Sequence, residues 1–175
     1  MTGRLIVLSG LPGVGKTSIA EIVAARTGSV HLCIDAVEES LLACGLPSGW
    51  QVGVAAYEAT RVMAEQNLRL GHDVVVDAVN DSEEARQTWR TAALRTGANL
   101  DFVHLVISDL QEHERRLGDR DRGLTYVGEP IWSDVQRRRA DYGAWSDEVL
   151  EFDTAVQAVD EFVAALAARL SSSSA

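Results

Sequence analysis

Lysine is almost absent from this sequence of 175 residues. Of its sixteen basic residues, fifteen are arginine, and Lys16 is the single lysine. The N-K-x-D motif with which GTPases recognise guanine therefore cannot occur, because Lys16 follows a glycine. A lone lysine among arginines indicates a position that requires a particular shape of positive charge, since an ammonium is a compact point charge and a guanidinium is a planar fork.

Other scarcities exclude further classes of protein. The two cysteines, Cys33 and Cys44, have neither metal-ligand spacing nor a disulfide pattern, so we expect two small buried side chains. The sequence has no apolar run long enough to span a membrane and no charged-then-apolar leader, which favours a cytoplasmic protein. Positive charge is also lacking: the net charge of −10 makes a nucleic-acid partner unfavourable.

Apolar runs alternate with amphipathic segments along the whole chain. This pattern predicts an α/β fold with three layers, in which helices cover both faces of a five-stranded parallel sheet. We expect a single domain over residues 1–170 and a frayed serine-rich tail over 171–175. The expected strands span 4–9, 30–35, 73–80, 101–108 and 148–152, and the expected helices span 16–28, 36–44, 54–70, 82–96, 109–117, 133–145 and 155–170.

The lysine lies in a glycine-rich loop between the first expected strand and the first expected helix. "GLPGVGKT" matches the pattern G-x-x-x-x-G-K-[ST], whose backbone N–H groups and helix N-terminus bind phosphates. A mobile ammonium follows the β- and γ-phosphates better than a guanidinium, and the following hydroxyl is a ligand for Mg²⁺. We therefore expect ATP or GTP with Mg²⁺, bound by Gly10, Leu11, Pro12, Gly13, Val14, Gly15, Lys16, Thr17 and Ser18.

Acidic residues follow the second and third expected strands. Because ligands of open α/β sheets gather at the carboxyl ends of the strands, Asp35 can accept the proton of an attacking hydroxyl. It can also cap the helix 36–44, and the two roles are compatible. Asp77, after "VVV", fits the acid that holds Mg²⁺ with Thr17, and the alternative is a buried structural acid.

Arginines gather after the fourth expected strand. "ERRLGDRDRG" contains Arg116, Arg120 and Arg122, and a lid over about residues 115–130 would bring them to the phosphates and to the transition state. The alternative is a solvated helix end in which nearby acids pair with these arginines. A second cluster, "QRRRA" (136–140), favours a surface salt-bridge face.

The glycine loop, Asp35, "VVVDAVN" and the arginine segment occur in the order typical of small P-loop kinases, which the chain resembles over about residues 4–156. This group includes gluconate- and shikimate-kinase-like enzymes, polynucleotide 5′-kinases, zeta toxins and chloramphenicol phosphotransferase-like proteins. "GDRDRG" and "EFDTA" are most similar to the arginine lid and the late strand end of the last of these. The resemblance implies Asp35 as general base, Arg116, Arg120 and Arg122 as lid arginines, and Asp153 and Thr154 near the nucleotide base.

The acceptor is less determined by the sequence. Aromatic and hydrogen-bonding side chains near the expected site suit a ring-bearing or polyhydroxylated small molecule, although each of them could instead serve packing or the surface. These candidates are Trp50, Gln51, Tyr57, Glu58, Arg61, Asn80 and Trp132. The leading hypothesis is a kinase that phosphorylates a hydroxyl of an uncharged small molecule, such as an antibiotic or a nucleoside-like compound. The alternatives are a polynucleotide 5′-hydroxyl kinase and a non-catalytic nucleotide-binding regulator, and the oligomeric state stays open.

Overall fold

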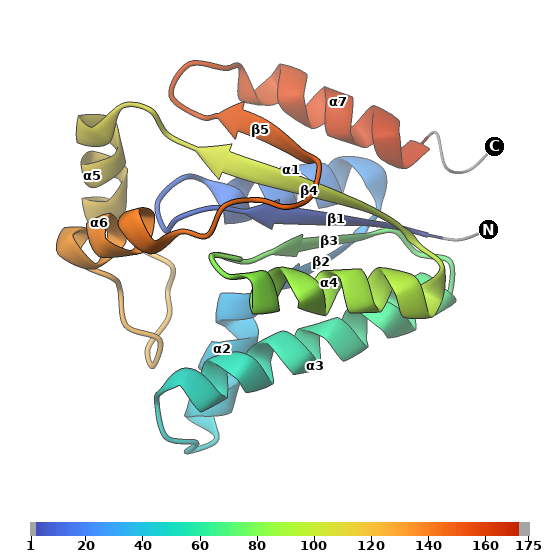
Figure 1. Cartoon of the computed structure of the whole chain (residues 1–175), viewed down its shortest axis with the longest axis horizontal. Coiled ribbons are helices and arrows are strands. Elements are labelled where there is room, and N and C mark those ends of the chain that lie inside the picture. The colour runs from blue at the N-terminus through green and yellow to red at the C-terminus, as the bar shows by residue number, and fades with distance from the viewer. Residues whose placement is uncertain (1–2, 172–175) are drawn as a thin grey trace.

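The computed structural model describes residues 3–171 and contains a five-stranded parallel sheet in the order β2-β3-β1-β4-β5 (Figure 1). The prediction of a five-stranded parallel sheet is therefore confirmed. The strands are β1 (Arg4–Ser9), β2 (Val30–Cys33), β3 (Val74–Asp77), β4 (Asn99–Val106) and β5 (Val149–Asp153).

Helices cover both faces of the sheet, as expected. Helices α1 and α7 pack together on one face, while α3 and α4 lie on the other, and α5 and α6 stand at the edge to which the strand arrows point (Figure 1). The helices are α1 (Lys16–Thr27), α2 (Ile34–Ala43), α3 (Trp50–Arg69), α4 (Glu83–Thr96), α5 (Leu110–Gly118), α6 (Trp132–Asp141) and α7 (Val159–Ser171).

The central strand shows why the sheet is covered on both sides. Leu5, Ile6, Val7 and Leu8 are fully buried, and alternate residues belong to opposite apolar clusters. Ile6 and Leu8 pack toward α1 and α7, whereas Leu5 and Val7 pack toward α3 and α4. An apolar run without alternation is the pattern of a strand buried on both faces, and this interpretation is confirmed.

Several element boundaries differ from the prediction. β2 stops at Cys33 because Cys33 pairs with Asp77, the last residue of β3, and no strand continues beyond it. Ile34 and Asp35 are therefore the first residues of α2 rather than the end of a strand. α3 begins at Trp50, directly after Gly49, whose φ of 147° interrupts any helix.

Further differences lie at β3, which ends at Asp77 rather than at residue 80, and at β4, which spans 99–106 rather than 101–108. Two helices in the second half of the chain also differ. α6 ends at Asp141, because Tyr142 adopts an extended backbone conformation and leads into a linker to β5. α7 begins at Val159, because Asp153 first closes a turn in which its carboxylate accepts from the N–H of Ala155. Of the expected tail, Ser171 ends α7, and residues 172–175 lie outside the described part of the chain.

A buried arginine fixes the linker after α6. Arg86 on α4 is fully buried and donates to the carbonyl oxygens of Asn80, Gly143 and Ala144 at 2.6–3.0 Å. Its guanidinium also stacks on the ring of Trp145, 3.9 Å from the ring centre. Three carbonyls and an aromatic face thus replace the water that this cation loses, and they hold the loop after β3 in place.

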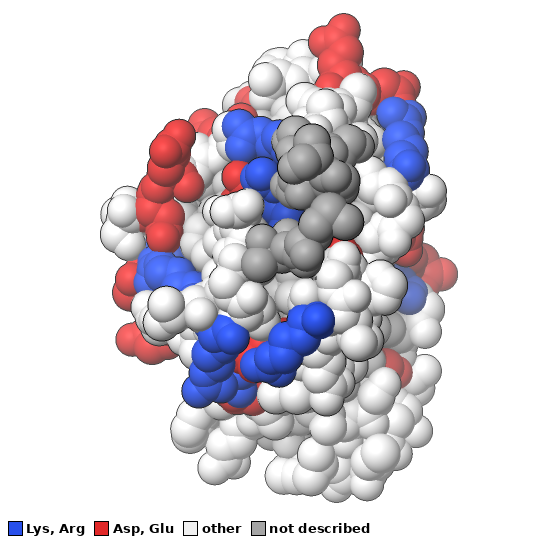
Figure 2. Space-filling model, turned by 90° about the vertical axis from the view of Figure 1, so that its right-hand side faces the viewer, with Lys and Arg blue, Asp and Glu red and all other residues white. Residues whose placement is uncertain are grey.

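The surface carries side chains of both charges and one of the two cysteines. None of the described helices is long and apolar enough to cross a membrane. On the face in Figure 2, acidic and basic side chains lie interspersed. One expectation was wrong: Cys44 is exposed and Cys33 is only half-buried, and both are free thiols.

Candidate functional site

The glycine loop closes over the carboxyl end of β1 and leads directly into α1. Gly10 approaches the carbonyl oxygen of Leu105 so closely that a Cβ atom would lie 2.3 Å from it. Gly15 precedes α1 with a φ of 96°, which side chains other than glycine rarely adopt. With no side-chain cap on this helix, its first N–H groups are left for a ligand, and phosphate oxygens suit them.

Lys16 is folded back into this loop. The side chain is 7% exposed, and Nζ donates to the carbonyl oxygen of Leu11 at 3.0 Å. Burial lowers the pKa of Lys16 to about 8, although Asp77 and Asp35 act in the opposite direction. A bound phosphate would supply the negative charge that this buried ammonium lacks.

Asp77 lies at the end of β3 among three polar side chains. Its Oδ1 faces the hydroxyl of Thr17 at 3.4 Å, and its Oδ2 accepts from His31 Nε2 at 2.7 Å. The thiol of Cys33 is 3.6 Å from Oδ1, and burial raises the pKa of that thiol to about 12. The cysteine is therefore a neutral neighbour rather than a nucleophile.

Thr17 and Asp77 have the chemistry of a magnesium site. Mg²⁺ prefers oxygen ligands and is commonly held by one or two protein groups together with water and phosphate oxygens. A hydroxyl and a carboxylate 3.4 Å apart at the foot of the phosphate loop fit that ligand set. Within residues 3–171 no cluster of three or more histidine, cysteine or acidic side chains could hold a metal ion.

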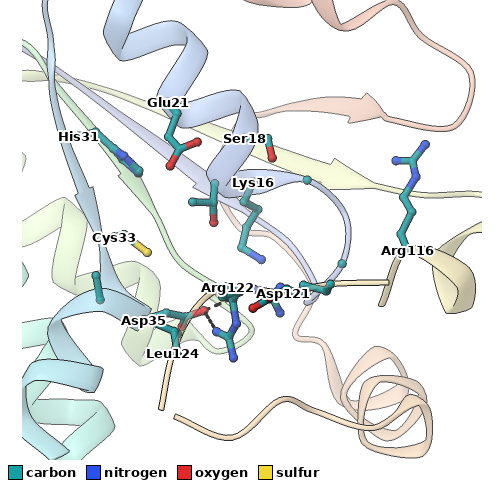
Figure 3. Close-up of a pocket in the computed structure, with 15 residues that line it drawn as sticks. Lys16, Ser18, Glu21, His31, Cys33, Asp35, Arg116, Asp121, Arg122 and Leu124 are labelled. Carbon is teal, nitrogen blue, oxygen red and sulfur yellow. Dashed lines mark hydrogen bonds and ion pairs between the residues drawn. The ribbon is translucent and has the colours of Figure 1, made fainter. Parts of the chain in front are cut away.

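Asp35 faces the same cavity from the first turn of α2. Its carboxylate pairs with the guanidinium of Arg122 (Figure 3) and lies 3.6 Å from that of Arg120. Both arginines also pair with Glu129. The additional role that the sequence allowed for Asp35, as the cap of this helix, is wrong: Cys33 occupies the cap position, without a side-chain hydrogen bond. The acid is instead part of a charged network that reaches the lid.

Residues 119–131 connect α5 to α6, coincide with most of the segment for which the sequence predicts a lid (about 115–130), and are held on α2; we call this segment the lid. The carboxylate of Glu39 accepts from the backbone N–H groups of Thr125, Tyr126 and Val127 at 2.7–3.1 Å. Desolvation opposes ionisation, but these hydrogen bonds lower the pKa of Glu39. Together with the Asp35–Arg122 pair, this anchor holds the lid arginines over the glycine loop.

Arg116 lies at the opposite side of the cavity from Asp35 (Figure 3). It donates to the hydroxyl of Thr154 at 3.0 Å and to the Thr154 carbonyl at 3.2 Å. Asp153 accepts from the N–H groups of Ser108 and Ala155 and so shapes the turn after β5. The structure therefore brings Arg116, Asp153 and Thr154 together, and it separates Arg116 from Arg120 and Arg122.

A buried histidine connects the glycine loop to both helices that flank the lid. His113 on α5 donates from Nε2 to the carbonyl oxygen of Pro12 at 2.7 Å, so its Nδ1 accepts from Arg139 on α6 at 2.6 Å. Trp132 meets its ring edge-on, with the ring centres 5.1 Å apart. Burial lowers the pKa of His113, and the positive charges of Arg139, Lys16 and Arg116 act in the same direction.

The main cavity has a volume of about 750 Å³, which is large enough for a nucleotide. It is lined by the glycine loop, by residues of β2 and of the first turn of α2, and by the lid arginines (Figure 3). Lys16 and Asp35 both point into it, and Ser18 and Glu21 line it from α1. The candidate site is thus a phosphate-binding loop that shares one cavity with a carboxylate and three arginines.

Comparison with known proteins agrees with this arrangement. Residues 5–142 match the model of the AAA domain family. This chain belongs to that family. It is also 27% identical over 125 residues to the adenylate kinase isoenzyme 6 homolog of Schizosaccharomyces pombe, an alignment that covers 71% of this chain and 65% of that protein.

Solved structures show where the fold of this AAA domain recurs. A sugar kinase from Janibacter sp. HTCC2649 superposes with a TM-score of 0.70 at 19% identity, covering 97% of this chain and 95% of the other. The APS kinase of Mycobacterium tuberculosis, in complex with AMPPNP and APS, gives a TM-score of 0.69 at 22% identity over 97% and 98%. At these identities the likeness concerns the fold, and the predicted P-loop kinase-like fold is confirmed.

The acceptor candidates chosen from the sequence are not gathered in the main cavity. Trp50 is 77% exposed at the start of α3, and Arg61 pairs with Glu58 and Glu65 on the same helix. Gln51 is also exposed on that helix. Trp132 lies against His113, outside the cavity lining.

Tyr57 and Asn80 make hydrogen bonds that hold the loop after β3 in place. The hydroxyl of Tyr57 accepts from the backbone N–H of Asn80 at 3.2 Å. The amide of Asn80 donates to Ser9 and accepts from Trp89, each at 2.8 Å, and its φ is 53°. With both ends of the amide occupied, Asn80 shapes this loop of the AAA domain rather than facing a ligand.

Sequence reasoning missed His31, Glu38, Glu39 and His113. A usable signal existed for the first three. His31 and Cys33 alternate along a strand and therefore share the face on which Asp77 lies. Glu38 and Glu39 follow Asp35 by three and four residues and so lie on its side of the helix. His113 had no such signal, because its partners are a carbonyl oxygen and an arginine on other elements.

Proposed function

We propose that this chain is a kinase that transfers the γ-phosphoryl group of ATP or GTP to a hydroxyl of a small molecule. The observation that carries this proposal is that Lys16 and Asp35 line the same cavity. A phosphate-binding ammonium and a carboxylate facing one space match the two ends of a phosphoryl transfer, the triphosphate and the attacking hydroxyl.

In the proposed reaction, the acceptor oxygen forms a bond to the γ-phosphorus while the bond from that phosphorus to the leaving nucleoside diphosphate breaks. Asp35 takes the hydroxyl proton, and Lys16, Arg120 and Arg122 balance the charge on the phosphoryl oxygens. Thr17 and Asp77 would hold Mg²⁺, which supplies further positive charge at the phosphates.

The lid network supports a role for Asp35 that depends on the triphosphate. The carboxylate of Asp35 pairs with Arg122. When a triphosphate draws the lid arginines toward its oxygens, that pairing weakens and the carboxylate becomes available to a hydroxyl.

The main test is transfer of labelled phosphate from γ-labelled ATP and GTP to a panel of acceptors: neutral sugars, nucleosides, antibiotics with free hydroxyls, and oligonucleotides with a 5′-hydroxyl. We expect labelled product with at least one small-molecule acceptor and none with the Lys16→Ala variant, which should keep the fold because the side-chain hydrogen bond that it loses goes to Leu11 in the same loop. Label on the oligonucleotide alone would favour a polynucleotide kinase. Nucleotide binding with no transfer to any acceptor would favour a regulator.

A further inference from the structure

A smaller cavity of about 190 Å³ adjoins the main one at its transfer end. The two share Lys16, Asp35, Arg120 and Arg122, but the smaller one continues past Pro12 toward Glu38 on α2 and Arg138 on α6. A molecule in this second space would contact the carboxylate of Asp35 and the phosphate end of the main cavity at once. It is therefore the space in which an acceptor hydroxyl can meet both.

The three arginines that line this small cavity already have acidic partners, and the remaining cation, Lys16, belongs to the glycine loop that would bind the triphosphate. Arg120 and Arg122 pair with Asp35 and Glu129, and Arg138 lies 3.3 Å from the carboxylate of Asp81. An acceptor that carries a carboxylate or a phosphate would have to displace one of these acids to find a cation. The pairing disfavours anionic acceptors.

The small cavity is also lined by a carboxylate that has no cationic partner close to it among the described residues, that of Glu38. This carboxylate makes no hydrogen bond and no close ion pair with any residue in the range 3–171. Glu38 follows Asp35 by three residues on α2, so the two carboxylates lie on one side of the helix. Burial and the charge of Asp35 raise the pKa of Glu38, and the more distant charges of Arg122 and Arg138 act in the opposite direction.

We propose that this cavity takes a neutral, polyhydroxylated acceptor of monosaccharide size, and that Glu38 accepts hydrogen bonds from its non-reacting hydroxyls. This inference rests on the proposed function and names its substrate class. A volume of about 190 Å³ lies below the range of roughly 300–1,000 Å³ typical of pockets for drug-sized ligands. One carboxylate can accept from two neighbouring hydroxyls, and it repels an acid.

The first test compares acceptors on the wild-type protein. Phosphoryl transfer is measured with neutral monosaccharides and polyols, with sugar acids, and with nucleoside monophosphates, all at matched concentrations. We expect kcat/KM for the best neutral polyol to exceed that for its own acid derivative by at least tenfold. A preference for the acid or for the monophosphate would overturn the inference and leave the kinase proposal standing.

The second test changes Glu38 itself. Glu38→Gln keeps the size of the side chain and should raise KM for the neutral acceptor by about ten- to a hundredfold, because a charge-assisted hydrogen bond is lost. The Kd of AMPPNP, measured by calorimetry, should change by less than about twofold, a change too small for the loss of any phosphate contact. Glu161→Gln, an exposed acid on α7, is the matched control and should change neither constant.

Reversing the charge of Glu38 predicts the direction in which acceptor specificity changes. Glu38→Arg should move the ratio of kcat/KM between the acid derivative and the neutral acceptor toward the acid by more than about tenfold. An unchanged KM in Glu38→Gln together with an unchanged ratio in Glu38→Arg would overturn the role of Glu38. If no acceptor is labelled and no polyol binds in the presence of AMPPNP, the proposed function and this inference fail together.

Discussion

At the scale of single residues, the central contact of the site is the folded-back ammonium of Lys16. Its Nζ is buried and donates to the Leu11 carbonyl, so the loop encloses one small cation. A guanidinium is wider, flat and longer, and its five N–H groups could not all find acceptors in this space. The retention of one lysine among fifteen arginines has a physical reason at this position.

Lys16→Arg is therefore predicted to act as a loss of function rather than a conservative change. We expect the rate of transfer to fall by on the order of a hundredfold or more, since the charge no longer follows the γ-phosphate in the transition state. Steady-state transfer and a thermal melt check the prediction, the melt showing that the fold is intact. Near-normal turnover in this variant would contradict the account of the loop.

The sequence predicted the loop and both acids, but not every role of the side chains around them. The glycine-loop motif is defined by spacing, and spacing is visible in a sequence. Asn80 and Tyr57 have ligand-like chemistry, yet their partners are Ser9, Trp89 and each other. Which polar group is already satisfied depends on contacts between distant segments, and composition does not reveal these.

At the scale of elements, the lid is placed by α2 and by the helices at its own two ends. Glu39 holds three successive N–H groups of the lid, and His113 joins α5, α6 and the glycine loop through two hydrogen bonds. The expectation of a lid over about residues 115–130 rested on charge and glycine content. Its anchor could not be predicted, because the partners of Glu39 are backbone groups 86 to 88 residues away.

Glu39→Gln tests this anchor. An amide has one acceptor oxygen in place of two, so the lid should open more often, and we expect kcat to fall by about tenfold with a smaller change in nucleotide Kd. Limited trypsin digestion gives an independent readout, because cleavage after Arg120 and Arg122 should accelerate.

Glu114→Gln is the control for this experiment. Glu114 is exposed on α5 close to the lid but is not part of the anchor. Equal digestion rates for the wild type and Glu39→Gln, with an unchanged kcat, would show that the Glu39 contacts do not hold the lid.

At the scale of the whole molecule, the order of strands and helices follows from hydrophobic pattern, while the exact ends depend on pairing. The strand expected at 30–35 is two residues too long because β3 offers no partner beyond Asp77. That difference moves Asp35 from a strand end into the first turn of α2, yet leaves it facing the cavity. A site at the carboxyl edge of a parallel sheet tolerates such shifts, because the topology decides which elements meet there.

The acidic character of the chain also has a consequence at this scale. With a net charge of −10 and arginines around the site that pair with acids, we expect the protein to bind a nucleic-acid backbone weakly. The whole arrangement thus favours one bound nucleotide and a small partner for it, with Asp35 between them.

The most direct test of this account is single-turnover phosphoryl transfer by Asp35→Asn and Asp77→Asn across a series of Mg²⁺ concentrations. We predict that Asp35→Asn loses transfer by on the order of 10²–10⁴-fold at every Mg²⁺ concentration while its nucleotide Kd stays near that of the wild type. Asp77→Asn should instead recover transfer as Mg²⁺ is raised. Full transfer by Asp35→Asn, or its recovery by added Mg²⁺ alone, would contradict the assignment of Asp35 as the general base.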